Sequence, residues 1–131
     1  MIAIGFGTGG GCPIDSLIHL LCGCRDEATR TNDKARFSGL FTVDRAQHRD
    51  LRAAVEQALA LPVTLIAPEQ LIVMADRVVT RSARSIEHYG VGSVAEAAAL
   101  LGAGPGSRLL MPRRIFDKAT CATAIQRGKA A

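Results

Sequence analysis

Apolar residues occur along this chain both in short runs, which are typical of buried strands, and in longer stretches at helical spacing. The short runs predict strands at residues 1–4, 37–43, 63–66, 108–111 and 119–125. The longer stretches predict helices from Asp15 to about residue 24, over 46–61, within 78–89 and over 94–101. This alternation predicts an α/β three-layer sandwich with a mainly parallel, mixed sheet of about five strands, in which the last strand can run antiparallel.

The stretch 92–102 has the clearest pattern in the chain. Ser93 stands at a helix N-cap position, and Glu96 follows three residues later, where it can reach back to the N–H of the cap residue. Between Val94 and Leu101 every residue except Glu96 is apolar, and four residues are alanine. The sequence therefore predicts a small, buried helix that packs closely against the sheet.

The polar ends of this stretch form a candidate anion site. A helix N-terminus at Gly92, Ser93 and Glu96 offers unpaired N–H groups and a partial positive charge. Arg113 and Arg114 are predicted to follow the end of the 108–111 strand. Ligands of open α/β sheets bind at such strand ends, so we expect both arginines to face the same ligand.

A glycine-rich segment follows the first predicted strand. Gly5, Gly7 and Gly9 leave the backbone open to a ligand, with Thr8 between them. The spacing G-x-G-x-x-G is present, but no acidic residue ends a second strand about 20 residues later, and no Lys-Ser/Thr pair of a P-loop follows. Nucleotide binding, contact with another ligand and a plain flexible turn all remain open.

Two charged residues follow the second predicted strand directly. Asp44 and Arg45 come after Val43, and parallel strands would bring them to the same sheet edge as the glycine-rich segment. We expect them among the ligand-binding residues.

No catalytic or metal-binding constellation stands out. His19, His48 and His88 lie far apart in sequence, and no nucleophile pairs with them in any recognisable spacing. Cys22 and Cys24 resemble a metal motif, but residues two apart on a helix point to different sides, and buried or idle thiols are the simpler interpretation. The sequence thus leans against an enzyme and against a resident metal or cofactor. His88 and Tyr89 are predicted to have surface or packing roles.

Composition indicates a globular protein. The 131 residues are 48% hydrophobic and 21% charged, and they predict one domain over 1–131 with a frayed tail at 126–131. No apolar run is long enough to cross a membrane, no basic leader is visible, and four cysteines are too few for a disulfide scaffold. A cytoplasmic location without membrane partners is the expectation.

The net charge of +4 is unevenly distributed. Residues 105–131 hold six basic residues and one acidic residue, whereas the rest of the chain holds ten basic and eleven acidic residues. Such a local excess, to which Lys118 contributes beside the two arginines, indicates an anionic partner. The chain has no Trp and one Tyr, too few aromatic rings to stack nucleic-acid bases. We therefore expect a polyanionic small molecule and no nucleic acid.

Three segments of the second half resemble a known family. The segments 93–101 (SVAEAAALL), 109–114 (LLMPRR) and 119–124 (ATCATA) are similar, in the same order and at similar spacing, to the S-V-A-E-A-A-A-L helix, the L-L-V-P-K segment and the T-V-A-I-A strand of the CobE and CbiG C-terminal domain family. The segments 4–7, 42–44 and 67–71 agree more loosely with the front of that family. Family members have a cysteine and basic residues after the first G-x-G, where this chain has Thr8, Gly9 and Gly10.

The resemblance implies a role in cobalamin (vitamin B12) biosynthesis. It implies that the chain binds or hands over an anionic corrinoid or precorrin intermediate, a tetrapyrrole-derived small molecule, and that pathway enzymes such as methyltransferases are possible partners. Corrin precursors carry many carboxylates around an apolar ring, which suits arginines, helix N-termini and a glycine loop at one sheet edge. The alternatives are an enzyme of the same pathway, hydrolase or transferase, and a Rossmann-like nucleotide-binding module.

Overall fold

The computed structural model describes residues 1–32, 34 and 36–126. Most of the predicted tail, residues 127–131, lies outside the described residues. The strands are β1 (Ile2–Thr8), β2 (Phe37–Val43), β3 (Val63–Ile66), β4 (Arg108–Phe116) and β5 (Ala119–Ile125). The helices are α1 (Ile14–Thr31), α2 (Ala46–Leu59), α3 (Pro68–Leu71), the 3₁₀ helix η1 (Ile72–Met74), α4 (Ala83–Tyr89) and α5 (Val94–Ala103).

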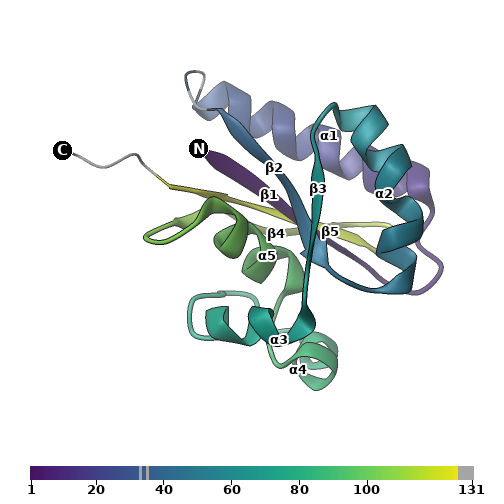
Figure 1. The fold of residues 1–131 in the computed structure, drawn as a ribbon, viewed down its shortest axis with the longest axis vertical. Helices are drawn as coiled ribbons and strands as arrows, with labels where there is room; N and C mark the ends of the chain where they lie inside the picture. The colour runs from purple at the N-terminus through teal and green to yellow at the C-terminus, as the bar shows by residue number, and fades with distance from the viewer. Residues whose placement is uncertain (33, 35, 127–131) are drawn as a thin grey trace.

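The five strands form one mixed sheet in the order β3-β2-β1-β5-β4 (Figure 1). β1, β2 and β3 pair in parallel, whereas β5 runs antiparallel to both β1 and β4. Strand β1 is therefore the point where the sheet changes direction, because the next strands in sequence lie on one side of it and the last two on the other. This confirms the predicted α/β fold with an antiparallel last strand.

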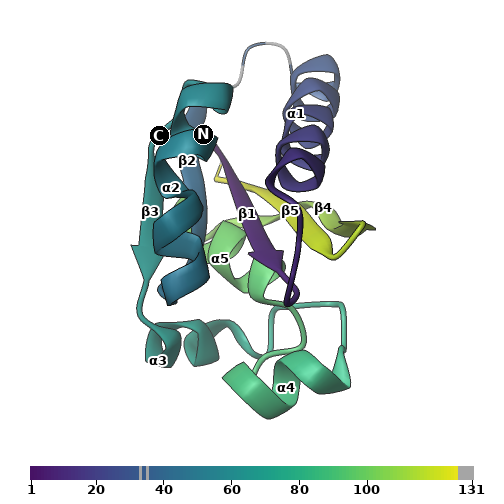
Figure 2. The ribbon, with the colours of Figure 1, turned by 90° about the vertical axis from the view of Figure 1, so that its right-hand side faces the viewer.

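Two layers of helices cover the sheet (Figure 1). α1 and α2 cover one face over a core that includes Phe6, Leu17, Leu21 and Leu40. α5 covers the other face over a second core, in which several alanines pack with larger side chains such as Ile66, Leu71 and Leu100. Figure 2 shows α3 and α4 beyond the end of β1, so the α5 side continues past the sheet edge. None of the helices in the described part of the chain has the length and apolar character needed to span a membrane.

The close approach of α5 to the sheet depends on Gly5. A Cβ atom on Gly5 would collide with the carbonyl oxygen of Ala95 and the backbone nitrogen of Ala99. Without that atom, the alanine face of α5 rests directly on the backbone of β1, and Ala95 and Ala99 are fully buried. The predicted buried helix is confirmed, and it begins at Val94 after the cap residue Ser93, whose side chain accepts a hydrogen bond from the N–H of Glu96.

Three element boundaries differ from the prediction. β1 continues through Gly5 and Gly7 to Thr8, because strand pairing with β2 and β5 satisfies the backbone there. α1 starts at Ile14 after the cap residue Pro13 and extends to Thr31, since Cys24 and Ala28 continue its buried stripe. β4 does not end at residue 111 but runs to Phe116, so Arg113 and Arg114 lie inside a strand.

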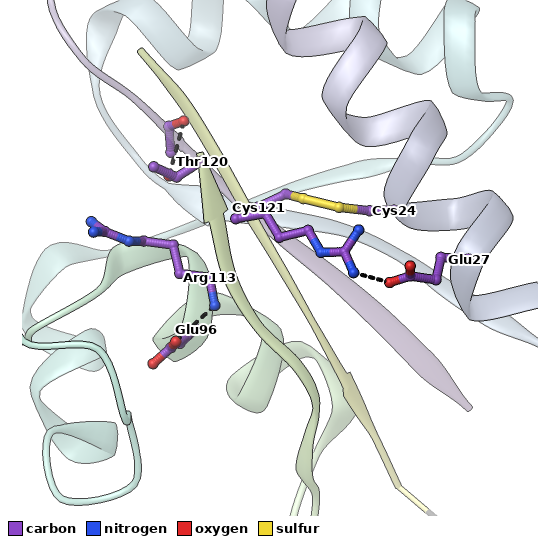
Figure 3. The surroundings of a disulfide bond; sticks show 8 residues. Cys24, Glu27, Glu96, Arg113, Thr120 and Cys121 are labelled. Carbon is purple, nitrogen blue, oxygen red and sulfur yellow. Dashed lines mark hydrogen bonds and ion pairs between the residues drawn. A yellow bond between two sulfur atoms is a disulfide. The ribbon is translucent and has the colours of Figure 1, made fainter. Parts of the chain in front are cut away.

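Cys24 of α1 and Cys121 of β5 form a disulfide that lies between helix α1 and the sheet (Figure 3). Cys12 and Cys22 are free thiols. The interpretation of Cys22 and Cys24 as buried or idle thiols is thus wrong for Cys24. Among the described residues, no group of three or more His, Cys, Asp or Glu side chains is placed to hold a metal ion.

Candidate functional site

A pocket of about 500 Å³ lies at the carboxyl ends of β1 and β2. The N-terminus of α5 and the helix α4 form its other walls. This is the position at which open α/β sheets bind ligands, beside the strand where the sheet order reverses. The lining residues are Gly7, Thr8, Gly9, Gly10, Val43, Arg45, His48, Ser82, Arg84, Ser85, His88, Tyr89, Ser93, Val94, Arg113 and Thr120.

The end of β1 forms the floor of the pocket. Gly7 pairs with Thr120 of β5, and a Cβ atom on Gly7 would lie 3.0 Å from the Thr120 Oγ1 and 3.8 Å from the Val94 side chain. The missing side chain therefore leaves room between β1 and the start of α5. Gly7, Thr8 and Gly9 were all predicted to contact a ligand, and the structure brings them together on this floor.

Ser93 joins this floor at the N-terminus of α5. The side chain is buried, and its Oγ accepts the Glu96 N–H at 3.1 Å. The other half of the predicted capping box is absent, because the Glu96 carboxylate points elsewhere. Its Oε1 accepts the N–H groups of Val79 and Thr80 at 2.8 and 3.0 Å. Its Oε2 accepts the Thr80 hydroxyl at 2.6 Å and the Arg113 N–H at 2.8 Å.

Glu96 is thus a structural residue and not a ligand contact. Burial raises the pKa of its carboxyl, but hydrogen bonds from Thr80, Arg113 and Val79 outweigh burial and hold the pKa below its usual range. The charged carboxylate joins α5 to the segment before α4 and to β4. It therefore fixes the backbone of Arg113 at the pocket wall.

Three arginines line the pocket, and no carboxylate among the described residues does. Arg45 donates through Nη1 to the Thr8 carbonyl at 3.1 Å and through Nη2 to Gln47 at 2.8 Å. The guanidinium groups of Arg84 and Arg113 form no ion pair within the described part of the chain. The pocket therefore presents excess positive charge to whatever enters it.

Arg114 does not belong to this group, contrary to the prediction. Because successive side chains of a strand point to opposite faces, Arg113 and Arg114 separate once β4 includes both. Arg114 pairs with Glu27 of α1 on the other face of the sheet. Figure 3 shows the Arg113 side chain pointing away from Glu27 and from the disulfide.

Four other residues that the sequence suggested as ligand contacts lie outside the pocket lining. Gly5 packs against α5, and a Cβ atom on Gly92 would collide with the Thr80 carbonyl, so both glycines serve close packing. Asp44 pairs with Arg49 at 2.6 Å on the surface. Lys118 is exposed in the turn between β4 and β5, where its carbonyl accepts the Gly9 N–H at 2.7 Å.

A buried histidine connects the pocket to the core. The Nε2 of His48 lies 2.9 Å from the Thr8 Oγ1, and its Nδ1 lies 2.9 Å from the Val43 carbonyl. A hydroxyl beside an imidazole that a third group orients is the arrangement of an activated nucleophile. Burial is the main cause that lowers the pKa of His48 to about 4, although the Val43 hydrogen bond raises it. At neutral pH the ring is therefore too weak a base to remove the proton of the Thr8 hydroxyl. Its role is to hold that hydroxyl in position.

Sequence reasoning missed ten of the sixteen residues that line the pocket. The missed residues are Gly10, Val43, His48, Ser82, Arg84, Ser85, His88, Tyr89, Val94 and Thr120. His88 and Tyr89 were predicted to have surface or packing roles, but α4 places them at the pocket wall. For Thr120, the available signal was its place near the start of the predicted strand at residues 119–125. The pairing that brings it to the end of β1 appears only in the structure. No spacing in the sequence indicates that α4 returns to cover the same edge.

Known proteins that resemble this chain share one pathway in their descriptions. The family model described as "Cobalamin synthesis G C-terminus" matches residues 2–124. The crystal structure of CobE, described as a protein from the cobalamin (vitamin B12) biosynthetic pathway, is 30% identical with a TM-score of 0.82 and covers 97% of this chain and 91% of its own. The cobalamin biosynthesis protein chiG from Agrobacterium tumefaciens str. C58 is 30% identical with a TM-score of 0.68 and covers 96% of this chain and 98% of its own. No curated protein sequence matches the chain.

Proposed function

This chain belongs to the cobalamin synthesis G C-terminus family, and on that premise we propose that it binds an anionic corrin intermediate in the pocket at the carboxyl ends of β1 and β2. The chain is a cobalamin biosynthesis protein. Within that pathway, the proposed role is to hold an intermediate or to hand it to a pathway enzyme.

The pocket's charge carries this proposal. Arg45, Arg84 and Arg113 surround a cavity without any carboxylate among its described lining residues. Guanidinium groups bind carboxylates through paired, charge-assisted hydrogen bonds, and such pairs are strongest where water is partly excluded. Corrin intermediates carry carboxylates on the side arms around their ring, so they offer several partners to three arginines at once.

The remaining surfaces of the pocket suit the ring itself. The Val43 and Val94 side chains and the Tyr89 ring supply apolar contact, and Gly7 and Gly9 leave the floor free of side chains. Ligand sites combine an apolar lining with a few convergent polar groups, and a volume of about 500 Å³ falls in their usual range. A macrocycle would lie with one face toward the floor and its acidic side arms toward the arginines.

A titration with two corrins of different charge tests this proposal. Hydrogenobyrinic acid is a metal-free corrin whose side arms end in carboxylates, and a derivative with its side arms amidated serves as the matched control. We expect the acid to bind with a shift of its visible absorption spectrum, more weakly as salt rises, and the amide to bind at least about tenfold more weakly. Equal affinity for both corrins, or no spectral shift with the acid, contradicts the proposal.

A second candidate is a hydrolase that acts in the same pocket, which the Thr8–His48 pair favours. The low pKa of His48 counts against it, since a ring with a pKa of about 4 takes up a proton poorly at neutral pH. Incubation of the protein with the amidated corrin, whose amide bonds a hydrolase could cleave to carboxylates and ammonia, followed by mass spectrometry of the pigment, separates the two. A changed mass that depends on Thr8 and His48 supports catalysis, and an unchanged mass supports binding alone.

A further inference from the structure

The floor of the pocket differs in hydrogen-bonding character from its arginine walls. Two threonine hydroxyls line it, that of Thr8 on the α2 side of β1 and that of Thr120 on the α5 side of the neighbouring strand β5. A threonine hydroxyl can donate one hydrogen bond and accept two, so the group that takes its proton decides what it offers to a ligand. For both threonines, neighbouring groups of the protein fix which atom receives the hydroxyl proton.

The tautomer of His48 follows from its neighbours at Nδ1. The Val43 carbonyl lies 2.9 Å from Nδ1 and can only accept. The Thr42 Oγ1 lies 3.0 Å from Nδ1, and its own proton is already donated to the Phe6 carbonyl at 2.6 Å. Both neighbours are therefore acceptors, and Nδ1 must carry the proton.

The Thr8 hydroxyl responds to this tautomer. A neutral ring protonated at Nδ1 has a bare Nε2 that can only accept a hydrogen bond. The Thr8 Oγ1 lies 2.9 Å from Nε2, so its proton is donated to the ring. The ring is neutral at physiological pH because burial lowers its pKa to about 4. The Thr8 oxygen therefore has only lone pairs left for a ligand.

The Thr120 hydroxyl also donates its proton within the protein, in this case to a backbone carbonyl. Its hydroxyl donates to the Gly7 carbonyl at 3.2 Å, across the pair of strands β1 and β5. The side chain is half-buried and lines the pocket on the α5 side of the sheet. One hydroxyl oxygen on each side of the sheet end is thus available as an acceptor, whereas the arginines on the walls only donate.

We propose that Thr8 and Thr120 are specificity-determining residues that accept hydrogen bonds from an N–H or O–H group of the bound molecule. This inference rests on the proposed function and adds a requirement to it. The ligand must present a hydrogen-bond donor beside its acidic arms, because a carboxylate at either threonine would face an oxygen atom with no proton between them. A metal-free corrin meets the requirement through its ring N–H groups.

The first arm of the test needs no ligand. Nitrogen-15 NMR of the histidine side chains distinguishes the two neutral tautomers of His48. We expect Nδ1 to be protonated and Nε2 to be the bare nitrogen that accepts the Thr8 hydroxyl. A His48 ring protonated at Nε2 would overturn the inference, since it would then donate to Thr8.

The second arm compares the affinities of variants for hydrogenobyrinic acid. T8V keeps the side-chain shape and removes the hydroxyl, T8S restores the hydroxyl, and T64V changes an exposed threonine of β3 as the matched control. We expect T8V to weaken binding about tenfold, T8S and T64V to stay within about twofold of the unaltered chain, and T120V to follow T8V. The loss should not depend on salt, unlike the loss caused by removing an arginine.

The outcomes separate this inference from the proposed function. T8V binding as tightly as the unaltered chain, or T8S being as impaired as T8V, overturns the inference while the proposed function stands. If the unaltered chain does not bind the acid, the proposed function fails, and the tautomer of His48 then decides the inference alone. Protonation at Nδ1 would support an acceptor floor for another ligand, and protonation at Nε2 would overturn it.

Discussion

Glu96 is a buried carboxylate that accepts four hydrogen bonds, from two N–H groups and one hydroxyl at residues 79–80 and from the N–H of Arg113. It thereby joins three segments that are distant in sequence. A buried charge is tolerated only when hydrogen bonds replace the water that it has lost. Here that requirement places Arg113, the cation of β4 that faces the pocket, at a fixed position.

Replacing Glu96 with glutamine tests this role. In E96Q the amide NH₂ would face N–H donors, and one or more of them would lose its acceptor inside the protein. We expect the free energy of unfolding to fall by about 2–3 kcal/mol in urea denaturation at pH 7. E69Q, at an exposed position of α3, should change it by less than about 0.5 kcal/mol. An unchanged stability of E96Q would show that the network is not stabilising.

His48 gives the fold a pH dependence of known sign. Its pKa is lowered from 6.5 to about 4 in the folded chain, so between these values the unfolded chain binds a proton that the folded chain does not. His48 therefore favours folding fully above pH 6.5, and the contribution is lost as pH falls toward 4. From pH 7 to pH 5 we expect a loss of about 2 kcal/mol.

Urea denaturation at both pH values, on the unaltered chain and on H48Q, measures this contribution. The glutamine variant lacks the titrating group and should lose about 2 kcal/mol less over the same interval. Glu96 contributes little here, because the stabilisation from its lowered pKa is lost only as pH falls below 4.5. Identical pH profiles for the two proteins would contradict the buried, neutral state of His48.

Individual contacts of the site followed from the sequence only where local rules govern them. The N-cap role of Ser93 and the open backbone at Gly7 and Gly9 are local properties, and the structure places all three residues at the pocket. The direction of Arg114 depends on where β4 ends, and no local signal after Pro112 revealed that the strand continues. His48 and Thr8 are 40 residues apart, and only the fold brings them within 2.9 Å.

At the scale of elements, the contact between α5 and β1 organises the molecule. Ala95 and Ala99, together with the absence of a side chain at Gly5, let the helix rest on the strand backbone. This close packing puts the N-terminus of α5 beside the end of β1. The close contact between α5 and β1 therefore positions both the pocket floor and the N-terminus of α5 beside it.

Alanine substitutions at two glycines test the packing. G5A would force a methyl group into the backbone of α5, so we expect a loss of at least about 3 kcal/mol or failure to fold. Gly10 has no neighbouring atom within 4 Å of an added Cβ and no positive φ, so G10A should change stability by less than about 1 kcal/mol. Thermal unfolding monitored by circular dichroism would measure both. A G5A variant as stable as G10A would contradict the close approach.

The element boundaries show where pattern reading stops. Helix α1 runs past the polar residues after Arg25 because Leu17, Leu21, Cys24 and Ala28 keep a helical period against the sheet. The helical spacing of these four residues is present in the sequence, but the polar residues between and after them suggested that the helix ends earlier. The extension of β4 was not visible, because its partner β5 supplies the hydrogen bonds and Pro112 is tolerated on an edge strand.

At the scale of the whole molecule, the order of the strands decides where a ligand can bind. β1 lies between the parallel half and the antiparallel half of the sheet, and its carboxyl end opens beside α5 and α4 (Figure 2). The alternation of strands and helices predicted this layered architecture and the carboxyl edge of the sheet. The return of α4 to the same edge, with Arg84 and His88, depends on tertiary packing that the sequence pattern does not encode.

The central claim is that positive charge directed into this pocket holds an anionic corrin. Arg113 and Arg114 offer the most direct test, because they are neighbours of the same type that the pleat of β4 sends to opposite faces. Titration of hydrogenobyrinic acid into R113A and R114A, followed by visible absorption, measures the effect of each. We predict that R113A weakens binding at least about tenfold at low salt while R114A stays within about twofold. Equal affinities for the two variants, or a larger loss in R114A, would contradict the account.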